Sequence, residues 1–178
     1  MISTDLLDLV VTAIGTSTDA GARVYSPGDW PAMDENLPLL KVRLLSEKRQ
    51  SMARSGAPQF TTTATIRIIG EVDAYAAEDN AGASVAQAAA WQLKRQVEVA
   101  VINSSPLFAQ IQQIAAMRSD AAFSAEGDKH IAGIQIDLDL EFYEGPEEFA
   151  PIAADDLNEA ALTADHYPPV AALIPLTS

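Results

Sequence analysis

Three carboxylates come nearest, by type and spacing, to residues that could do chemistry. Asp137, Asp139 and Glu141 stand at every second position of the stretch Ile131 to Tyr143. Successive side chains of a β-strand point to opposite faces, so these three would share one face. Such a row could present a divalent cation to a substrate, as in a metal-dependent enzyme. A solvated strand face in an acidic protein gives the same pattern. We favour that second interpretation and expect no enzyme, no catalytic residue, no metal and no cofactor.

The strand that carries these carboxylates is the clearest in the sequence. Its other face would hold five apolar residues. They are Ile134, Ile136, Leu138, Leu140 and Phe142. A register slip of one residue would bury the carboxylates, so the register is strongly specified. Glu126 to Lys129 reads as a turn that joins this strand to a preceding one.

Composition limits the classes of function. The chain has 178 residues and a net charge of -14, which argues against a protein that grips nucleic acid through its phosphates. It contains no cysteine, so a disulfide, a thiolate metal site and a cysteine nucleophile are all excluded. The apolar run Leu6 to Ile14 is interrupted by Asp8, and we expect neither a signal sequence nor a membrane span.

Two helices are predicted. Ser3 or Thr4 can cap the first, which runs to about Ile14. The second is long and alanine-rich, from Glu78 to Asn103. On its predicted apolar face, apolar residues recur every four positions. The residues of that face are Val85, Ala89, Leu93, Val97 and Val101.

Further strands are predicted between and after these helices. Leu40, Val42 and Leu44 alternate with Lys41 and Arg43, and a second strand covers Phe60 to Val72. A long polar loop, Ser46 to Pro58, would join them. The segment Leu107 to Phe123 is ambiguous, because Ile111, Ile114, Ala115 and Met117 would suit a short helix. We favour a strand at Ile111 to Met117, because the strand that follows needs a partner. The predicted fold is α+β, with two helices packed on a mostly antiparallel β-sheet over residues 1–144.

Residues 145–178 differ in character from the rest. Five prolines separate short apolar clusters, and neither lysine nor arginine occurs after Lys129. A segment with so many interruptions cannot build a core of its own. We therefore expect an extended, Pro-rich C-terminal arm. Asp155 to Thr163 would form a short helix, and Val170 to Ile174 would add as a strand to a partner edge. A solvent-exposed tail is the alternative.

The order of two segments carries a resemblance. In the first, Arg23-Val24-Tyr25-Ser26-Pro27 leads to Asp29-Trp30-Pro31, and the second runs from Ala57 through Pro58, Gln59 and Phe60 to Thr61-Thr62-Thr63. This order resembles the tail terminator family of long-tailed bacteriophages, also called tail completion or minor tail protein U-like proteins.

The resemblance implies a structural virion protein without enzymatic activity. Such proteins form a hexameric ring that caps the tail tube, stops its polymerisation and offers a joining surface to the head connector or stopper. The implied partners are further copies of the chain, the major tail tube protein and the connector, with DNA only passing through the channel. The implied location is the virion, at the head–tail junction, after assembly in the host cytoplasm. A head-side completion or connector protein is the alternative within virion assembly.

Contact surfaces are suggested by the uneven charge. Lys48, Arg49 and Arg54 lie in the predicted loop, whereas the C-terminal third is acidic. A basic loop on one subunit could meet an acidic surface on the next, although neutralisation within one chain fits equally well. We take these three residues as candidates for subunit or tube contacts. The face of Asp137, Asp139 and Glu141 is the candidate for an acidic channel lining that repels DNA phosphates.

Overall fold

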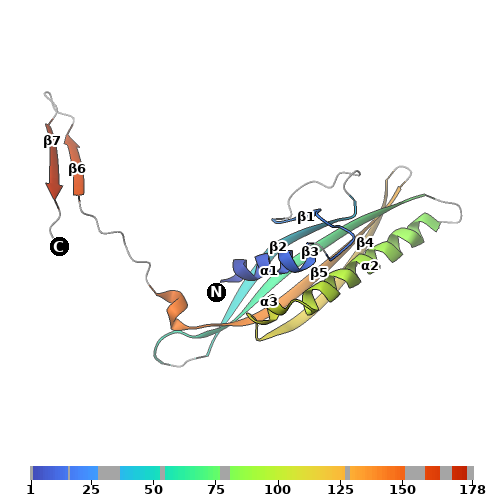
Figure 1. Ribbon diagram of the computed structural model, residues 1–178, viewed down its shortest axis with the longest axis horizontal. Coiled ribbons are helices and arrows are strands. Elements are labelled where there is room, and N and C mark those ends of the chain that lie inside the picture. Colours follow the sequence, from blue (N-terminus) through green and yellow to red (C-terminus); the bar gives the residue numbers. More distant parts are fainter. Residues whose placement is uncertain are drawn as a thin grey trace. The chain divides into compact units, whose positions relative to one another are not determined.

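The computed structural model (Figure 1) describes residues 2–15, 17–27, 37–52, 55–76, 81–126, 129–150, 159–164 and 170–175. The chain divides into two units, Met1–Glu148 and Phe149–Ser178. The expected division after residue 144 falls close to this boundary. A short 3-10 helix, η3 (Pro146–Phe149), follows the last strand of the first unit.

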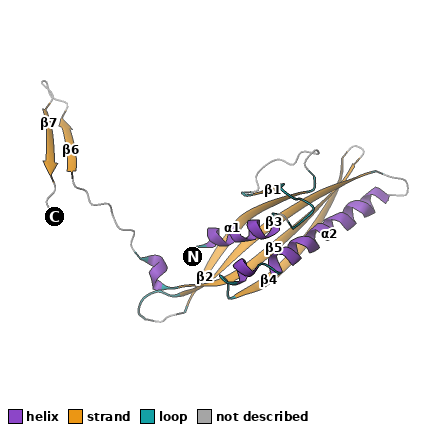
Figure 2. Ribbon diagram, in the orientation of Figure 1, coloured by secondary structure: helices purple, strands orange, loops and turns teal. Residues whose placement is uncertain are grey.

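A five-stranded sheet forms the centre of the first unit (Figure 2). Its strands are β1 (Val24–Tyr25), β2 (Leu39–Ser51), β3 (Phe60–Tyr75), β4 (Gln113–Glu126) and β5 (Lys129–Glu144). Their order in the sheet is β1-β2-β3-β5-β4. The short β1 pairs in parallel with β2, and the other three pairs are antiparallel. The α+β prediction with a mostly antiparallel sheet is therefore confirmed.

The helices lie on one face of this sheet (Figure 1). α1 (Ser3–Ile14) contacts β2, and α2 (Ala81–Ile102) contacts β3 and β5. A third helix, α3 (Ser105–Phe108), is a single turn capped by the Ser104 hydroxyl. No helix among the described residues is long and apolar enough to cross a membrane.

The cap predicted for α1 is wrong by one or two residues. Ile2 occupies the cap position, and its backbone N–H donates to Oδ2 of Asp5 at 2.9 Å. Ser3 is buried inside the helix, where its hydroxyl donates to Glu47. Because the Ser3 side chain is buried and bound to Glu47, it cannot cap the helix.

The core fills the space between the helices and the sheet. Ile134, Ile136, Leu138, Leu140 and Phe142 are all buried there, which confirms the alternation predicted for β5. Gly70 on β3 lies beneath α2, where an added Cβ would stand 3.0 Å from side chains of both Ile134 and Leu93. A glycine at this position therefore lets α2 approach the sheet closely.

The apolar face predicted for α2 is correct at its C-terminal half and wrong at its start. Leu93, Val97 and Val101 are buried, but Val85 is 58% exposed, and Ala86 and Ala90 face the core instead. A strict four-residue repeat advances faster than the helical period of 3.6 residues, so it leaves the buried face within a few turns.

The first six residues of the long loop predicted between the first two strands, Ser46 to Ser51, are strand instead. β2 continues to Ser51, and Glu47 to Ser51 pair with residues of β3 from Ala64 to Phe60. A bulge between Leu44 and Ser46 shifts the register on the way. The polarity of this stretch suggested a loop, but a hairpin arm that extends past the core tolerates polar residues.

The segment Ile111 to Met117 forms the favoured strand from Gln113 onward, and a separate short helix precedes it. α3 covers Ser105–Phe108, and β4 begins at Gln113, two residues later than predicted, and continues to Glu126. Glu126 pairs with Lys129, so the predicted turn between the last two strands of the unit is confirmed.

The second unit holds a two-stranded sheet. β6 (Glu159–Ala164) pairs antiparallel with β7 (Val170–Pro175). The helix predicted for Asp155 to Thr163 is wrong from residue 159 onward, and residues 155–158 lie outside the described part. Pairing with β7 overrides the helix propensity of the alanines. The strand predicted at Val170 to Ile174 is present, but its partner is β6 of the same chain.

Candidate functional site

The three carboxylates of β5 lie on the sheet face opposite the helices, which we call the open face. Asp137 is only 8% exposed, because Arg67 on the neighbouring β3 covers it. Arg67 donates from Nε to Oδ1 and from Nη2 to Oδ2, both at 2.8 Å. These hydrogen bonds hold the pKa of Asp137 below its ordinary value, against the opposing effect of burial.

The other two carboxylates also have partners within the sheet. Thr65 donates its hydroxyl to Oδ1 of Asp139 at 2.7 Å, and Gln113 donates from Nε2 to Oε1 of Glu141 at 3.2 Å. The three carboxylates are thus spaced along the strand, each with its own neighbour. Among the described residues, no group of three or more metal-ligating side chains could hold an ion. The metal site considered from the sequence is therefore not formed by these residues.

The open face is balanced in charge, which corrects the acidic face expected from β5 alone. The strand register places Arg43 beside Arg67, Arg67 beside Asp137, and Asp137 beside Arg118. Lys41 also forms an ion pair with Glu71, with Nζ 2.8 Å from Oε1. Basic residues from β2, β3 and β4 thus share the open face with the carboxylates of β5.

The candidate contact residues Lys48 and Arg49 lie on opposite faces of β2. Lys48 is exposed and pairs in register with Thr63. Arg49 points to the helix side, where its Nε donates to Glu144 at 2.7 Å and its Nη1 lies 2.6 Å from Glu47. Arg49 is therefore engaged within its own chain. Arg54 lies outside the described residues.

Glu144 is the centre of a polar cluster that the sequence analysis missed. It is 1% exposed and accepts hydrogen bonds from Arg49 and from the Thr62 hydroxyl. Burial by itself would raise the pKa of Glu144, but the hydrogen bonds from Arg49 and Thr62 outweigh it and lower that pKa. A signal was present in the sequence, since Glu144 continues the even-numbered buried positions of β5 by one step.

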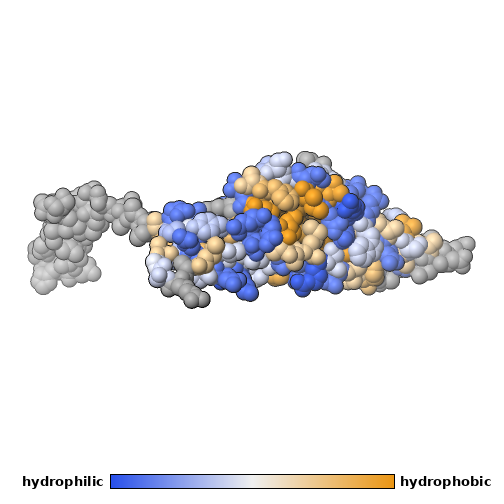
Figure 3. Space-filling view, turned by 90° about the horizontal axis from the view of Figure 1, so that it is seen from below, coloured by the Kyte–Doolittle hydropathy of each residue, from blue (hydrophilic) through white to orange (hydrophobic). Residues whose placement is uncertain are grey.

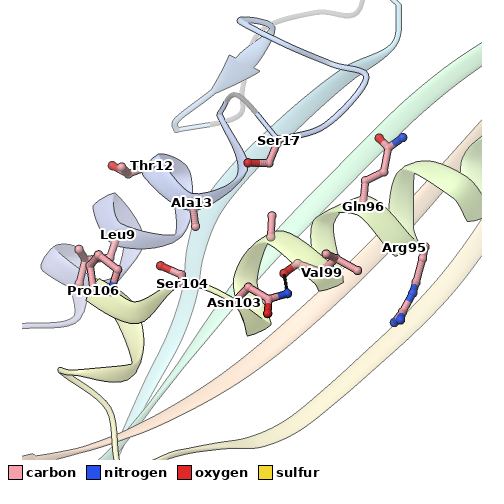
Figure 4. A pocket seen from close by; sticks show the side chains of 11 residues that line it. Leu9, Thr12, Ala13, Ser17, Arg95, Gln96, Val99, Asn103, Ser104 and Pro106 are labelled. Carbon is pink, nitrogen blue, oxygen red and sulfur yellow. Dashed lines mark hydrogen bonds between the residues drawn. The ribbon is translucent and has the colours of Figure 1, made fainter.

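An apolar groove separates α1 from α2 and α3 (Figure 4). One part has a volume of about 550 Å³ and includes Leu9, Ala13, Val99 and Pro106 in its lining. A second part of about 530 Å³ lies between α1 and α3 and shares Leu9 and Pro106 with the first. Polar side chains such as Gln96 and Asn103 also line the first part, and Asp5 and Asp8 line the second.

Exposed hydrophobic residues also occur outside the groove. Figure 3 views the molecule from the lower side of Figure 1, along which α2 and β4 run, and shows hydrophobic residues gathered among hydrophilic ones. Apart from Val99, which lines the groove, the large exposed hydrophobic residues of α2, α3 and β4 are Val85, Trp91, Ile102, Phe108 and Phe123. Apolar groups in such positions are typical of protein–protein contact surfaces.

β4 forms one edge of the sheet. Within the described part of the chain it pairs with β5 on one side and with no strand on the other. Most of its side chains are exposed, including Ala121, Ala122 and Phe123. We call this side of β4 the open edge. It presents backbone N–H and C=O groups that another strand could bind.

Comparison with known proteins found no matching family model and no matching curated protein. Among solved structures, one similar chain belongs to a structure described as "Virion of native gene transfer agent (GTA) particle". It is 11% identical to this chain, and the match covers 78% of this chain and 91% of that one, with a TM-score of 0.31.

Proposed function

We propose that this chain is a structural virion protein that assembles into a ring at the end of a phage tail tube and stops its polymerisation. The observation that carries the proposal is the one-sided sheet, whose open face and open edge lie free of the helices. Surfaces of this kind suit repeated association between copies. The resemblance of Arg23 to Pro31 and of Ala57 to Thr63 to tail terminators points the same way.

A terminator needs two different ends. One end of the ring binds the last ring of tube subunits, and the other must offer no copy of that binding surface, so that no further tube subunit adds. It then serves as the joining surface for the head connector, at the head–tail junction. We propose a hexameric ring, assembled in the host cytoplasm, with DNA passing through its channel without being held.

Some contact residues remain good candidates under this proposal. Lys48 is exposed on β2 and, together with Arg54, is proposed to contact a neighbouring copy or the tube. Arg49 is withdrawn as a candidate because Glu144 and Glu47 bind it internally. The open face, with Asp137, is proposed to flank the channel as a charge-balanced surface that neither grips nor strongly repels DNA.

The test is the mass of the purified protein by light scattering, followed by negative-stain imaging with and without tail tubes. We expect rings of about six subunits on tube ends, and overlong tails when the protein is left out. A monomer that ignores tubes, combined with tails of normal length in its absence, would refute the proposal. Rings of another symmetry that remain with capsids would assign the chain to the head side instead.

A further inference from the structure

The two long edges of the sheet differ in how they are protected against pairing with another chain. On β2, the short β1 covers the first part, and a bulge between Leu44 and Ser46 interrupts the rest. The strand is also rich in charge. Its charged residues are Lys41, Arg43, Glu47, Lys48 and Arg49. Bulges, charges and a covering strand are the usual means of preventing edge-to-edge pairing.

The open edge of β4 lacks most of this protection. β4 has 14 residues and contains neither proline nor lysine, and its bulge lies near its start, between Ile114 and Ala116. It carries three charged residues, Arg118, Asp120 and Glu126, against five on β2. From Ala116 to Glu126 the register against β5 is regular. A long, exposed edge with a regular register is a predicted site of strand pairing. Phe123, 55% exposed, faces the helix side of the sheet and would be covered by a further strand.

The β6–β7 hairpin is a small sheet that would gain stability by pairing with a further strand. It consists of two six-residue strands in a unit separate from the main sheet. A two-stranded hairpin alone is only marginally stable in water, and it gains stability when it joins a larger sheet. Its sequence is mostly alanine with leucine, valine and isoleucine, and it contains neither lysine nor arginine.

We propose that the β6–β7 hairpin of a second copy adds through β7 to the open edge of β4 and extends its sheet. Backbone hydrogen bonds would supply the affinity, and alternate apolar side chains would extend the core past Phe123. Because the described part of each copy offers both the β4 edge and the β6–β7 hairpin, the contact is head-to-tail and repeats from copy to copy. This inference rests on the proposed function to the extent that a ring needs such a contact.

The absence of native cysteine allows a direct test in the full chain. One variant carries Ala121→Cys on β4. A set of others carries cysteine in place of Ala171, Ala172, Leu173 or Ile174 in turn, so that every register is sampled. Each is mixed with the β4 variant under mild oxidation, and crosslinked pairs are counted on a denaturing gel. A disulfide forms only where the Cα atoms lie within about 7 Å.

The matched control places the second cysteine in the groove, as Thr12→Cys, which is also exposed. We expect at least one β7 variant to crosslink with Ala121→Cys about tenfold more than with Thr12→Cys. Preferential crosslinking to Thr12→Cys would overturn the proposal and make the groove the docking site. No crosslink above the control in any register would also overturn it. So would crosslinking confined to a single chain that carries both cysteines.

Hydrogen exchange supplies a second measurement without added cysteines. Raising the protein concentration should slow exchange in Ala116–Glu126 about tenfold or more, because association protects the edge amides. Leu173→Pro removes a backbone donor from β7 and should abolish that slowing while leaving α2 unchanged. Slowing that survives Leu173→Pro would contradict the assignment to the hairpin.

The two proposals fail in distinguishable ways. Rings on tube ends without the hairpin contact would remove this inference and leave the terminator function intact. Crosslinked copies that leave tail length unaffected would uphold the inference and refute the terminator function.

Discussion

Replacing Arg49 by methionine removes the cation beside a buried carboxylate. Glu144 is 1% exposed, and its hydrogen-bond partners are Arg49 and the Thr62 hydroxyl. In Arg49→Met only the hydroxyl remains. Methionine keeps most of the length and the apolar stem of the arginine, so the change concerns the charge more than the packing.

The loss of stability can be bounded from this geometry. Removing one partner of a buried ion pair costs about 3–5 kcal/mol, because the other charge remains buried. The Thr62 hydroxyl still donates to the carboxylate, and the Arg49 side chain is 40% exposed, so we expect the lower end, about 3 kcal/mol. In a chain of this size that corresponds to a fall in Tm of about 6–12 °C.

The pH dependence of the contribution that Glu144 makes to stability should change sign in Arg49→Met. In the parent, the pKa of Glu144 is lowered in the folded state, so its contribution is present above the unfolded pKa and is lost as pH falls through the folded pKa. Without Arg49 burial dominates, and the folded pKa should lie above the unfolded one. The variant then gains stability relative to the parent as pH falls from neutral to about 4.

Urea denaturation, monitored by circular dichroism, measures both the loss of stability and its pH dependence. The protein concentration is kept fixed, because association between copies would add stability. Arg43→Met, at an exposed position of β2, is the matched control and should change stability by no more than about 0.5 kcal/mol. Adding Glu144→Leu to Arg49→Met should recover part of the loss, since no charge then remains buried. The reasoning is refuted if Arg49→Met behaves like Arg43→Met, or if its pH profile parallels that of the parent.

Three further outcomes are expected. In urea denaturation, Leu93→Ala should lower the free energy of unfolding by about 2–5 kcal/mol, and Val85→Ala by about 0.5 kcal/mol or less, because only Leu93 is buried. Equal losses would contradict the observed buried face of α2. Lys48→Glu should weaken ring formation or tube binding in light scattering and imaging without lowering Tm, and unaltered assembly and tail length would remove Lys48 from the contact surface. Millimolar Mg²⁺ or Mn²⁺ should leave Tm unchanged in a thermal scan, because the β5 carboxylates do not converge on one point, whereas a rise in Tm would reveal a site.

Patterns within a single element were predictable from the sequence. The alternation of β5 fixes which residues are buried, because a strand has a period of two and one face must be apolar. The C-terminal half of α2 was predicted correctly for a similar reason. Its first half was not, because a four-residue repeat drifts around the helix and small alanines can replace Val85 against the sheet.

Features that depend on pairing between elements were not predictable. The sequence of β5 alone shows three carboxylates, but the basic residues that balance their charge come from β2, β3 and β4. Only the strand register places Arg67 beside Asp137. Arg49 read as part of a loop because its stretch is polar, yet pairing with β3 and burial of Glu144 give it an internal role. The alanines of β6 favour a helix by propensity alone, and the pairing with β7 that makes this segment a strand cannot be read from its own residues.

The one-sided sheet places unequal demands on sequence change over time. Helix-side positions such as Ile136 and Leu138 lie in close-packed surroundings, where most changes of volume are costly. Open-face positions are held by cross-strand pairs, and a pair such as Arg67 and Asp137 can be exchanged together without repacking the interior. A lineage could therefore change what the outer surface binds while it keeps the fold, with the two faces of each strand diverging at different rates.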